Sequence, residues 1–448
     1  MKFTKMSLVA ALLIGSSAFA IENTKVSGDA KLYYSTTEND DSNSATDDGS
    51  LFDRANSLGQ AAVGLGITTD LAKGVSASVH TTVLTTLGLE NNLVGGVWAG
   101  NITPAAGTTA GDQLAGSNGT GWWIDNAWVA ATAGKTTAKV GRMALDTPLA
   151  FTEEWNIAQN TFEAFVVLNQ DLPDTTLVGA YVGGSNGANS ATVQNAQNGT
   201  TPFTGYTTYN DGAAAAGLAA VGGRGAYAAG VVNNSFKPVK AQAWYYDVVD
   251  VATAYWIQAD LDMDGILAGA QYVNMNPADT INIVGGGQFD ASSLNDSTGF
   301  ALMIGYAMKD VVTVKAAYSA MADDGVLTIQ NTATGDQTKL YTEAWWNYGV
   351  VGAVGATSYS FTAETKQVGV DFLAQYTHAD VDAKGNGSAA VMDEFTVTAG
   401  KSFGPLDATL AYIYASMDDK NGGNTIQGNN ASGKLDSNTI QAYLTLNF

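Results

Sequence analysis

The last nine residues of the chain, Ile440-Gln-Ala-Tyr-Leu-Thr-Leu-Asn-Phe448, carry apolar side chains at every even position and end on a phenylalanine. Successive side chains of a β-strand point to opposite faces, so the even positions would form one apolar face. A strand that crosses a lipid bilayer needs about 9–11 residues with such a face. The C-terminus therefore predicts a membrane-spanning strand, provided that the rest of the chain repeats the pattern.

The same alternation recurs along the chain, within 255–262, 300–306, 312–319, 367–376 and 394–400. A soluble β-sandwich can show this pattern too, so one segment discriminates weakly. The mean hydropathy is 0.00 and no stretch beyond the N-terminal run approaches 18 consecutive apolar residues, so no membrane-spanning helix is predicted in the mature chain. A bilayer admits only helices and closed barrels, which leaves a soluble all-β protein or a transmembrane barrel.

The connections between the alternating segments favour the barrel. Tight turns are predicted at 70–74, 133–136, 172–174 and 403–406, and long polar stretches at 38–60, 90–121, 184–222 and 417–437. Short turns on one side and long loops on the other are typical of outer-membrane barrels. Neighbouring aromatic residues are expected to form girdles at the membrane interfaces. They are Tyr33-Tyr34, Trp122-Trp123, Trp244-Tyr245-Tyr246, Tyr255-Trp256 and Trp345-Trp346.

We predict an all-β fold, a transmembrane antiparallel β-barrel of eighteen strands, an even number that puts both termini on the periplasmic side. The count is weakest at 349–366, where Ser358–Ala363 could form a strand, and about 16 to 20 strands also fit. Such a barrel is wide enough for an aqueous channel. The predicted strands are 24–36, 61–70, 75–87, 123–133, 136–142, 162–172, 175–184, 223–233, 239–248, 252–262, 266–275, 298–309, 311–321, 338–348, 367–378, 393–403, 407–416 and 438–448.

The N-terminus has the pattern of a secretory signal peptide. Lys2 and Lys5 precede the apolar run Met6–Ile14, and Ala18-Phe-Ala20 resembles a small-residue cleavage site. We predict that residues 1–20 are cleaved and that residues 21–448 form a single β-barrel domain in the outer membrane of a Gram-negative bacterium. A buried helix or an uncleaved anchor is the alternative, but the apolar run is short for a spanning helix.

Composition excludes several other classes of protein. Acidic residues outnumber basic ones 42 to 20, and the resulting net charge of −22 argues against nucleic acid as a partner. The absence of cysteine excludes disulfides, cysteine nucleophiles and cysteine-ligated zinc. The two histidines, His80 and His378, stand in no catalytic pattern. We therefore predict that the protein is not an enzyme and has no cofactor.

The candidate pore constriction follows the fifth predicted strand. Residues 139–164 are less polar than the other long connections, so we expect this third loop to pack inside the barrel rather than lie in water. Strict alternation would aim Arg142 at lipid, where a charge costs about 2–4 kcal/mol, so the strand should end or bulge there. The constriction would be either a charged eyelet that sets ion preference or a salt-bridge cluster at the rim. The predicted constriction residues are Arg142, Glu153, Glu154, Trp155 and Glu163.

Acidic residues at polar positions of the strands are expected to line the pore, namely Asp260, Asp262, Asp371 and Glu394. Charges facing lipid are costly, so the acid excess must lie in the lumen or the loops, which predicts a preference for cations at low salt. The run Asp260–Gly265 opens like a calcium-binding EF-hand loop. Because Gln271 stands at the twelfth position and no helices flank the run, we predict a strand end and a turn without a metal.

Several motifs resemble the eighteen-stranded porin D family of outer-membrane porins and the related Campylobacter-type major outer membrane porins. They are Gly141-Arg142, Leu145–Leu149, Asn160–Ala164, Leu168–Leu172, Thr175–Ala180, Leu267–Tyr272 and the terminal phenylalanine. The resemblance implies that the segment matching 148–162 is a third loop folded into the lumen. Because the chain has three arginines, the basic ladder of porin D does not carry over, and the acidic Campylobacter-type members suit it better. They imply a homotrimer, cation preference and calcium held by lumen carboxylates.

The predicted function is an outer-membrane porin, a passive diffusion channel for ions and small hydrophilic solutes that prefers cations. A channel selective for a small organic solute is the alternative, as is a surface adhesin or structural outer-membrane protein. The expected partners are these solutes, the lipid bilayer, lipopolysaccharide and further copies of the chain.

Overall fold

The computed structural model describes residues 22–41, 50–85, 87, 120–155, 157–185, 207–208, 225–283, 287–332, 337–382, 389–420 and 433–448. The predicted signal peptide, most of the long predicted connections and the side chains of Trp122 and Trp123 lie outside this part. Within the described residues, no helix combines the length and apolar character needed to span a membrane.

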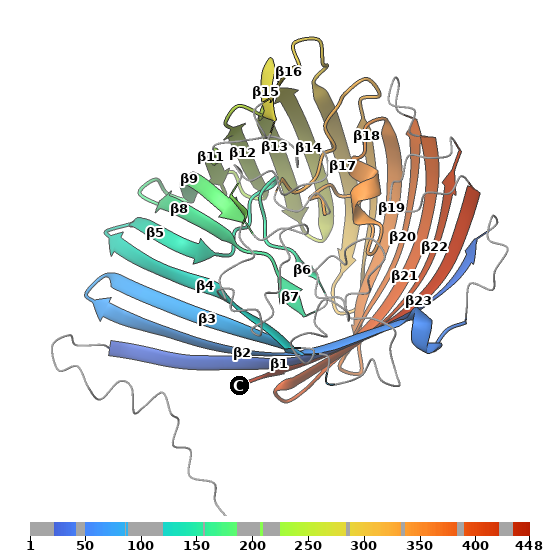
Figure 1. Ribbon diagram of the computed structural model, residues 1–448, viewed down its shortest axis with the longest axis horizontal. Coiled ribbons are helices and arrows are strands. Elements are labelled where there is room, and N and C mark those ends of the chain that lie inside the picture. Colours follow the sequence, from blue (N-terminus) through green and yellow to red (C-terminus); the bar gives the residue numbers. More distant parts are fainter. Residues whose placement is uncertain are drawn as a thin grey trace, which may run out of the picture.

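The strands form one antiparallel sheet that closes into a barrel (Figure 1). Its nineteen strands include the two-residue β10 (Thr207–Thr208), which pairs with the end of β9, so eighteen strands make up the wall. The predicted all-β barrel and its strand number are confirmed. The wall strands are β1 (Glu22–Asp41), β2 (Ser57–Ala72), β3 (Val75–Thr85), β4 (Thr120–Ala133), β5 (Thr136–Met143), β8 (Phe162–Asn169), β9 (Thr175–Ser185), β11 (Ala226–Asn233), β12 (Val239–Val248), β13 (Ala252–Met263), β14 (Ile266–Pro277), β17 (Ser297–Met308), β18 (Val312–Met321), β19 (Ala356–Gln367), β20 (Val370–Asp382), β21 (Ala389–Phe403), β22 (Leu406–Asp419) and β23 (Gly433–Asn447).

The two ends of the chain close this wall. β1 pairs with β23 from Asp29 opposite Asn447 to Asp41 opposite Leu435. The amide of Gly28 donates to the carbonyl of Phe448 at 2.7 Å, and the amide of Phe448 donates back at 2.9 Å. Closure pairs both edge strands, which a bilayer requires because hydrocarbon offers no partner to a free backbone group.

The two faces of the wall differ as the alternation predicts. Apolar side chains on the outer face stay exposed in the protein alone, such as Ile257 at 55% and Ile304 at 68%. Inward positions carry polar side chains, and Ser358 and Thr396 among them are fully buried. Polar side chains can be buried inside a barrel only if part of the chain covers them.

Two loops lie inside the barrel and supply that cover. The third loop, residues 144–161, connects β5 to β8 and contains the short strands β6 (Glu154–Trp155) and β7 (Ala158–Gln159), which lie within the ring of strands in Figure 1. The seventh loop, residues 322–355, connects β18 to β19 and contains the 3-10 helix η4 (Tyr348–Gly352). The inward fold of the third loop is confirmed, whereas the sequence did not predict that of the seventh.

The remaining elements lie between wall strands. The hairpin of β15 (Thr280–Ile283) and β16 (Gly287–Asp290) separates β14 from β17, and the 3-10 helix η1 (Arg54–Asn56) precedes β2.

The strand predicted at 338–348 is wrong. These residues belong to the seventh loop, and the strand between β18 and β20 is β19, within the stretch where the prediction was weakest. One strand is lost and one gained, so the total stays eighteen. The physical reason is that the backbone amides of 345–347 donate to the side chain of Glu394 rather than to a neighbouring strand.

The adjacent aromatic residues of β12 and β13 point to opposite faces of the wall, so they do not form a girdle together. On β12 and β13 the alternation buries Trp244 and Trp256 inside the barrel at 6% and 0% exposure. Tyr245 and Tyr255 face outward instead, with their ring centroids 5.2 Å apart. The pair Trp345-Trp346 lies in the seventh loop and not in a strand of the wall.

Gly141 of β5 has a backbone conformation and a close neighbour in β4 that leave no room for a side chain. Its φ of +123° is one that glycine adopts far more readily than other residues, and a Cβ there would lie 2.2 Å from the carbonyl oxygen of Ala127 in β4. We expect Gly141→Ala to destabilise the barrel by about 1–3 kcal/mol. The measurement is the temperature at which the folded band disappears on unboiled gels.

Gly179→Ala in β9 is the matched control, because no atom lies within 4 Å of a Cβ built there. Equal melting temperatures for the two variants would contradict the strain assigned to Gly141.

Candidate functional site

An apolar contact holds the third loop against the wall. Leu149 is 1% exposed and packs in one cluster with Trp244, Tyr246 and Trp256, which point inward from β12 and β13. The amide of Leu149 donates to the hydroxyl oxygen of Tyr246 at 3.4 Å. Burying an apolar loop against aromatic rings removes it from water, which explains why this loop is less polar than the others.

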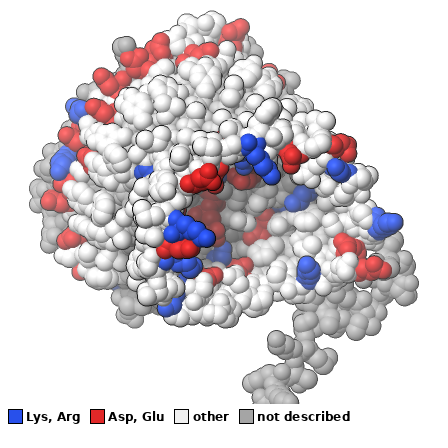
Figure 2. Space-filling model, turned by 180° about the vertical axis from the view of Figure 1, so that it is seen from behind, with Lys and Arg blue, Asp and Glu red and all other residues white. Residues whose placement is uncertain are grey.

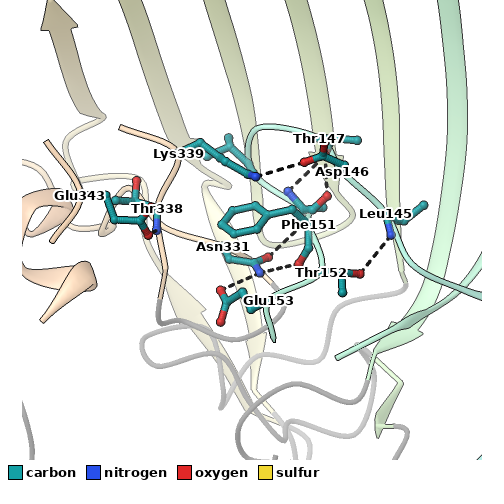
Figure 3. A network of polar contacts seen from close by, with 12 residues as sticks. Leu145, Asp146, Thr147, Phe151, Thr152, Glu153, Asn331, Thr338, Lys339 and Glu343 are labelled. Atoms are coloured by element: carbon teal, nitrogen blue, oxygen red, sulfur yellow. Dashed lines mark hydrogen bonds and ion pairs between the residues drawn. The ribbon is translucent and has the colours of Figure 1, made fainter. Parts of the chain in front are cut away.

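Asn331 joins the third loop to the seventh (Figure 3). Its side-chain nitrogen donates to the carbonyl of Phe151 at 2.7 Å and to Oε1 of Glu153 at 2.8 Å, and the amide of Gln337 donates to the same Oε1 at 3.1 Å. Asn331 is 0% and Glu153 1% exposed. A buried carboxylate is stable only with such donors, so these four residues form a specific polar contact that we call the loop junction.

Lys339 of the seventh loop makes a second link. Its Nζ lies 3.1 Å from Oδ1 of Asp146 and 4.5 Å from the ring centroid of Phe151, both in the third loop (Figure 3). Asp146 is largely exposed, so the ion pair adds only about 0–1 kcal/mol. It therefore contributes little to the stability of the contact between the two loops.

Glu394 of β21 binds the seventh loop to the wall. Its carboxylate accepts the amides of Trp345, Trp346 and Asn347 at 2.7, 2.9 and 2.8 Å, and the side-chain amide of Asn347 at 2.9 Å. Glu394 is 2% exposed. The prediction that it lines the pore needs correction, because it points inward but the seventh loop covers it.

Other inward polar residues of the wall hold the same loop. Gln271 of β14 donates to the carbonyl of Lys339 at 2.8 Å and accepts the amide of Tyr341 at 3.1 Å. The hydroxyls of Ser319 and Thr342 are 2.6 Å apart. The buried polar positions of the wall therefore serve as attachment points for a loop.

The remaining predicted pore-lining acids differ in their surroundings. Asp260 accepts a hydrogen bond from Gln258 at 2.9 Å and another from the hydroxyl of Tyr341, so it also contacts the seventh loop. Asp262 is exposed on the same side of β13, two residues nearer the turn. Asp371 lies beside the turn after β19, 2.9 Å from Nζ of Lys366. Their part in lining the pore stays a prediction.

The predicted cluster of Arg142 and three glutamates needs correction, because Arg142 and Glu163 lie in the wall. Nη2 of Arg142 donates to Oε1 of Glu163 at 2.7 Å. Glu163 alternates with the buried Phe162 and Ala164, so this pair lies on the outward side of β5 and β8. β5 ends at Met143, one residue later, which agrees with the expectation that the strand stops near the charge.

The glutamates of the third loop lie inside the barrel. Oε1 of Glu154 is 2.7 Å from Nζ of Lys31 on β1, and Glu153 belongs to the loop junction. Trp155 lies in β6, and its side chain is outside the described ones. Whether these residues set the constriction stays a prediction, but the structure brings Glu154 to a lysine that the sequence did not single out.

Glu343 is a titratable group that the sequence did not single out either. The amide of Thr338 donates to its Oε1 at 3.0 Å (Figure 3). Burial, and to a smaller extent the charge of Glu153, raise the pKa of Glu343 to about 8 against the opposing effects of the Thr338 amide and Lys339. Near neutral pH this carboxyl is therefore mostly protonated.

A cavity of about 380 Å³ lies between the two loops and the wall. It is lined by Glu154 from the third loop, by Gln337, Glu343, Ala344, Trp345, Trp346 and Tyr348 from the seventh, and by Leu373, Gln375 and Tyr443 from the wall. Sequence reasoning missed it because the seventh loop was assigned to a strand. The available signal was the lack of alternation within 342–352, where two tryptophans are adjacent.

Each of the two histidines is paired with an aspartate of a neighbouring strand. Nδ1 of His80 is 2.6 Å from Oδ1 of Asp125, and Nδ1 of His378 is 2.8 Å from Oδ1 of Asp393. The described residues contain no group of three or more His, Asp or Glu side chains that could hold a metal ion. Calcium in the lumen stays a prediction. The EF-hand-like run is the end of β13 and its turn, as predicted.

The chain matches a known protein family over most of its length. Residues 7–347 match the model of a family described as Gram-negative porin. No protein with a curated description is similar enough in sequence to count as a relative.

Several crystal structures share the fold. OccK8 (OprE) of Pseudomonas aeruginosa is 14% identical, with a TM-score of 0.64 over 96% of this chain and 99% of that one. OccAB3 of Acinetobacter baumannii is 12% identical, with a TM-score of 0.67 over 95% and 100%. Pseudomonas aeruginosa OpdK, solved with vanillate, is 13% identical, with a TM-score of 0.62 over 95% and 99%. At these identities the likeness shows the fold alone.

Asn331→Ala tests the loop junction. The carbonyl of Phe151 and the carboxylate of Glu153 would each lose a donor in a buried place, which costs about 1–3 kcal/mol per group. We expect the seventh loop to loosen and trypsin to cleave the folded variant faster after Lys339, as measured by mass spectrometry of timed digests.

Asn274→Ala is the control, because Asn274 of β14 donates to Thr298 in the wall and not to either loop. If cleavage after Lys339 were equally slow in the parent and in both variants, Asn331 would not hold the loops together.

Proposed function

This chain belongs to the Gram-negative porin family, and we propose that it forms a passive outer-membrane channel for ions and small hydrophilic solutes, with a preference for cations. The observation that supports this best is a closed barrel of eighteen strands whose inward face is polar, since a barrel of this size can enclose an aqueous lumen. In Figure 2 the molecule is hollowed, and acidic and basic side chains gather in and around the hollow.

The charge balance supports the preference for cations. Cleavage of the predicted signal peptide would remove Lys2 and Lys5 and leave 18 basic against 42 acidic residues. Asp260 and Asp262 lie on the inward side of β13, and Glu154 lies inside the barrel on the third loop. Acidic groups around a narrow aqueous path raise the local concentration of cations, an effect that weakens as salt shortens the ~10 Å Debye length at 0.1 M.

Glu154→Gln tests this preference. The variant removes one negative charge and leaves Lys31 without its ion-pair partner. A unit charge about 4 Å from a passing ion is worth about 1 kcal/mol in water, so cation permeability should fall, and anion permeability rise, by up to about fivefold each. The measurement is the reversal potential across planar bilayers under a gradient of potassium chloride at low salt.

Two control variants locate the effect. Asp40→Asn, at the exposed end of β1, and Arg142→Gln, on the outward side of the wall, should leave the reversal potential close to that of the parent. An anion-selective parent, or a Glu154→Gln variant as cation-selective as the parent, would refute the proposed preference. Bilayers that stay closed to ions would refute the channel itself.

We further propose a homotrimer, on the resemblance to porins and on one feature of the outer face. On that face Arg142 is 11% exposed, but its ion-pair partner Glu163 is 48% exposed, where hydrocarbon is costly for a charge and a neighbouring protomer would cover it. In mild detergents we expect about three times the 46.3 kDa chain mass by light scattering corrected for detergent. A protomer mass in every detergent tried would count against the trimer.

A further inference from the structure

The cavity between the loops has two kinds of lining that favour the same class of ligand. Three aromatic residues of the seventh loop, Trp345, Trp346 and Tyr348, and Tyr443 of β23 contribute to its wall. Two carboxyl groups, Glu154 and Glu343, contribute to the same wall. Aromatic faces attract cations through their quadrupole, and carboxylates do so through their charge.

The rest of the lining agrees with a small organic ion. Among the described lining residues none is a lysine or arginine, and Gln337, Gln375 and Leu373 add amide and apolar surface. A volume of about 380 Å³ lies at the small end of ligand pockets, which suits a molecule with one ring or a short chain. An inorganic cation would use the carboxylates but not the aromatic wall.

We propose that this cavity is a binding subsite for an organic ammonium ion that carries a small apolar body. The proposal deepens the proposed function and rests on it, because a solute in the lumen is what would reach the cavity. The ammonium group lies towards Glu154 and Glu343, and the apolar body lies against the tryptophans. The subsite makes the channel retain organic cations in preference to neutral or anionic molecules of the same size.

The state of Glu343 gives the binding a pH dependence. Its neighbours are Glu153 of the loop junction and Lys339, which is paired with Asp146, while Glu154 in the same cavity lining is paired with Lys31. Since the pKa of this carboxyl is about 8, it is mostly neutral below that pH and charged above it. A bound cation favours the charged form, so affinity should rise from pH 6 to pH 9.

The test uses benzyltrimethylammonium, whose charge does not titrate. Binding to the detergent-solubilised full-length barrel is measured by calorimetry, and block of the potassium current is measured in planar bilayers. Benzyl alcohol and benzoate are the neutral and anionic comparison compounds. We expect the cation to bind and to block the current at concentrations where the other two do neither.

Variants locate the binding. Trp346→Leu should weaken binding about fivefold through loss of a cation–π contact, and Trp346→Tyr should restore part of it. Glu343→Gln should remove the rise in affinity between pH 6 and pH 9. Glu364→Gln is the matched control, because Glu364 is an inward carboxylate of β19 paired with Lys315 at 2.8 Å and does not line the cavity.

Failure of the subsite and failure of the channel would give different results. If the barrel conducts ions but binds benzyltrimethylammonium no better than benzyl alcohol, the subsite is refuted and the channel stands. Equal weakening by Glu364→Gln and Glu343→Gln would also refute it, because the effect would then be one of overall charge. Binding by calorimetry without any conductance would support the subsite and refute the channel.

Discussion

Closure of the wall is the constraint on which the rest of the structure depends. In hydrocarbon every backbone donor and acceptor must find a partner within the protein, so the first and last strands have to pair. β1 and β23 meet this need, and the terminal Phe448 bonds back to Gly28. Once the wall is closed, the alternation has a fixed meaning, because one parity faces outward and the other faces the interior.

The interior is organised by polar side chains that the wall cannot satisfy alone. Glu394, Gln271 and Ser319 point inward and each bonds to the seventh loop. The third loop is attached differently, by packing Leu149 onto aromatic rings and by the loop junction at Asn331. The two attachments bring Glu154, Glu343 and the aromatic residues around one cavity, although they come from separate parts of the chain.

The sequence predicted most of the wall because a membrane-spanning strand carries its own signal, one apolar side chain at every second position. The prediction was wrong at 338–348, where loop residues with aromatic and β-favouring side chains have the composition of a strand but bond to Glu394. It also misjudged Arg142 and the adjacent aromatic residues. The alternation itself aims Arg142 outward and sends adjacent aromatic residues to opposite faces; what it does not contain is the partner of Arg142, Glu163 on the neighbouring strand.

By itself the sequence determined the class of fold, the strand number and the inward packing of an unusually apolar third loop. These follow from local periodicity and from the cost of exposing apolar residues to water. Only the tertiary structure decided which charges share a site. Glu154 meets Lys31 across the interior, Glu153 meets Asn331, and Arg142 stays with Glu163 in the wall. Each of these pairs depends on strand register and on loop paths through a shared space, and no short stretch of sequence contains that information.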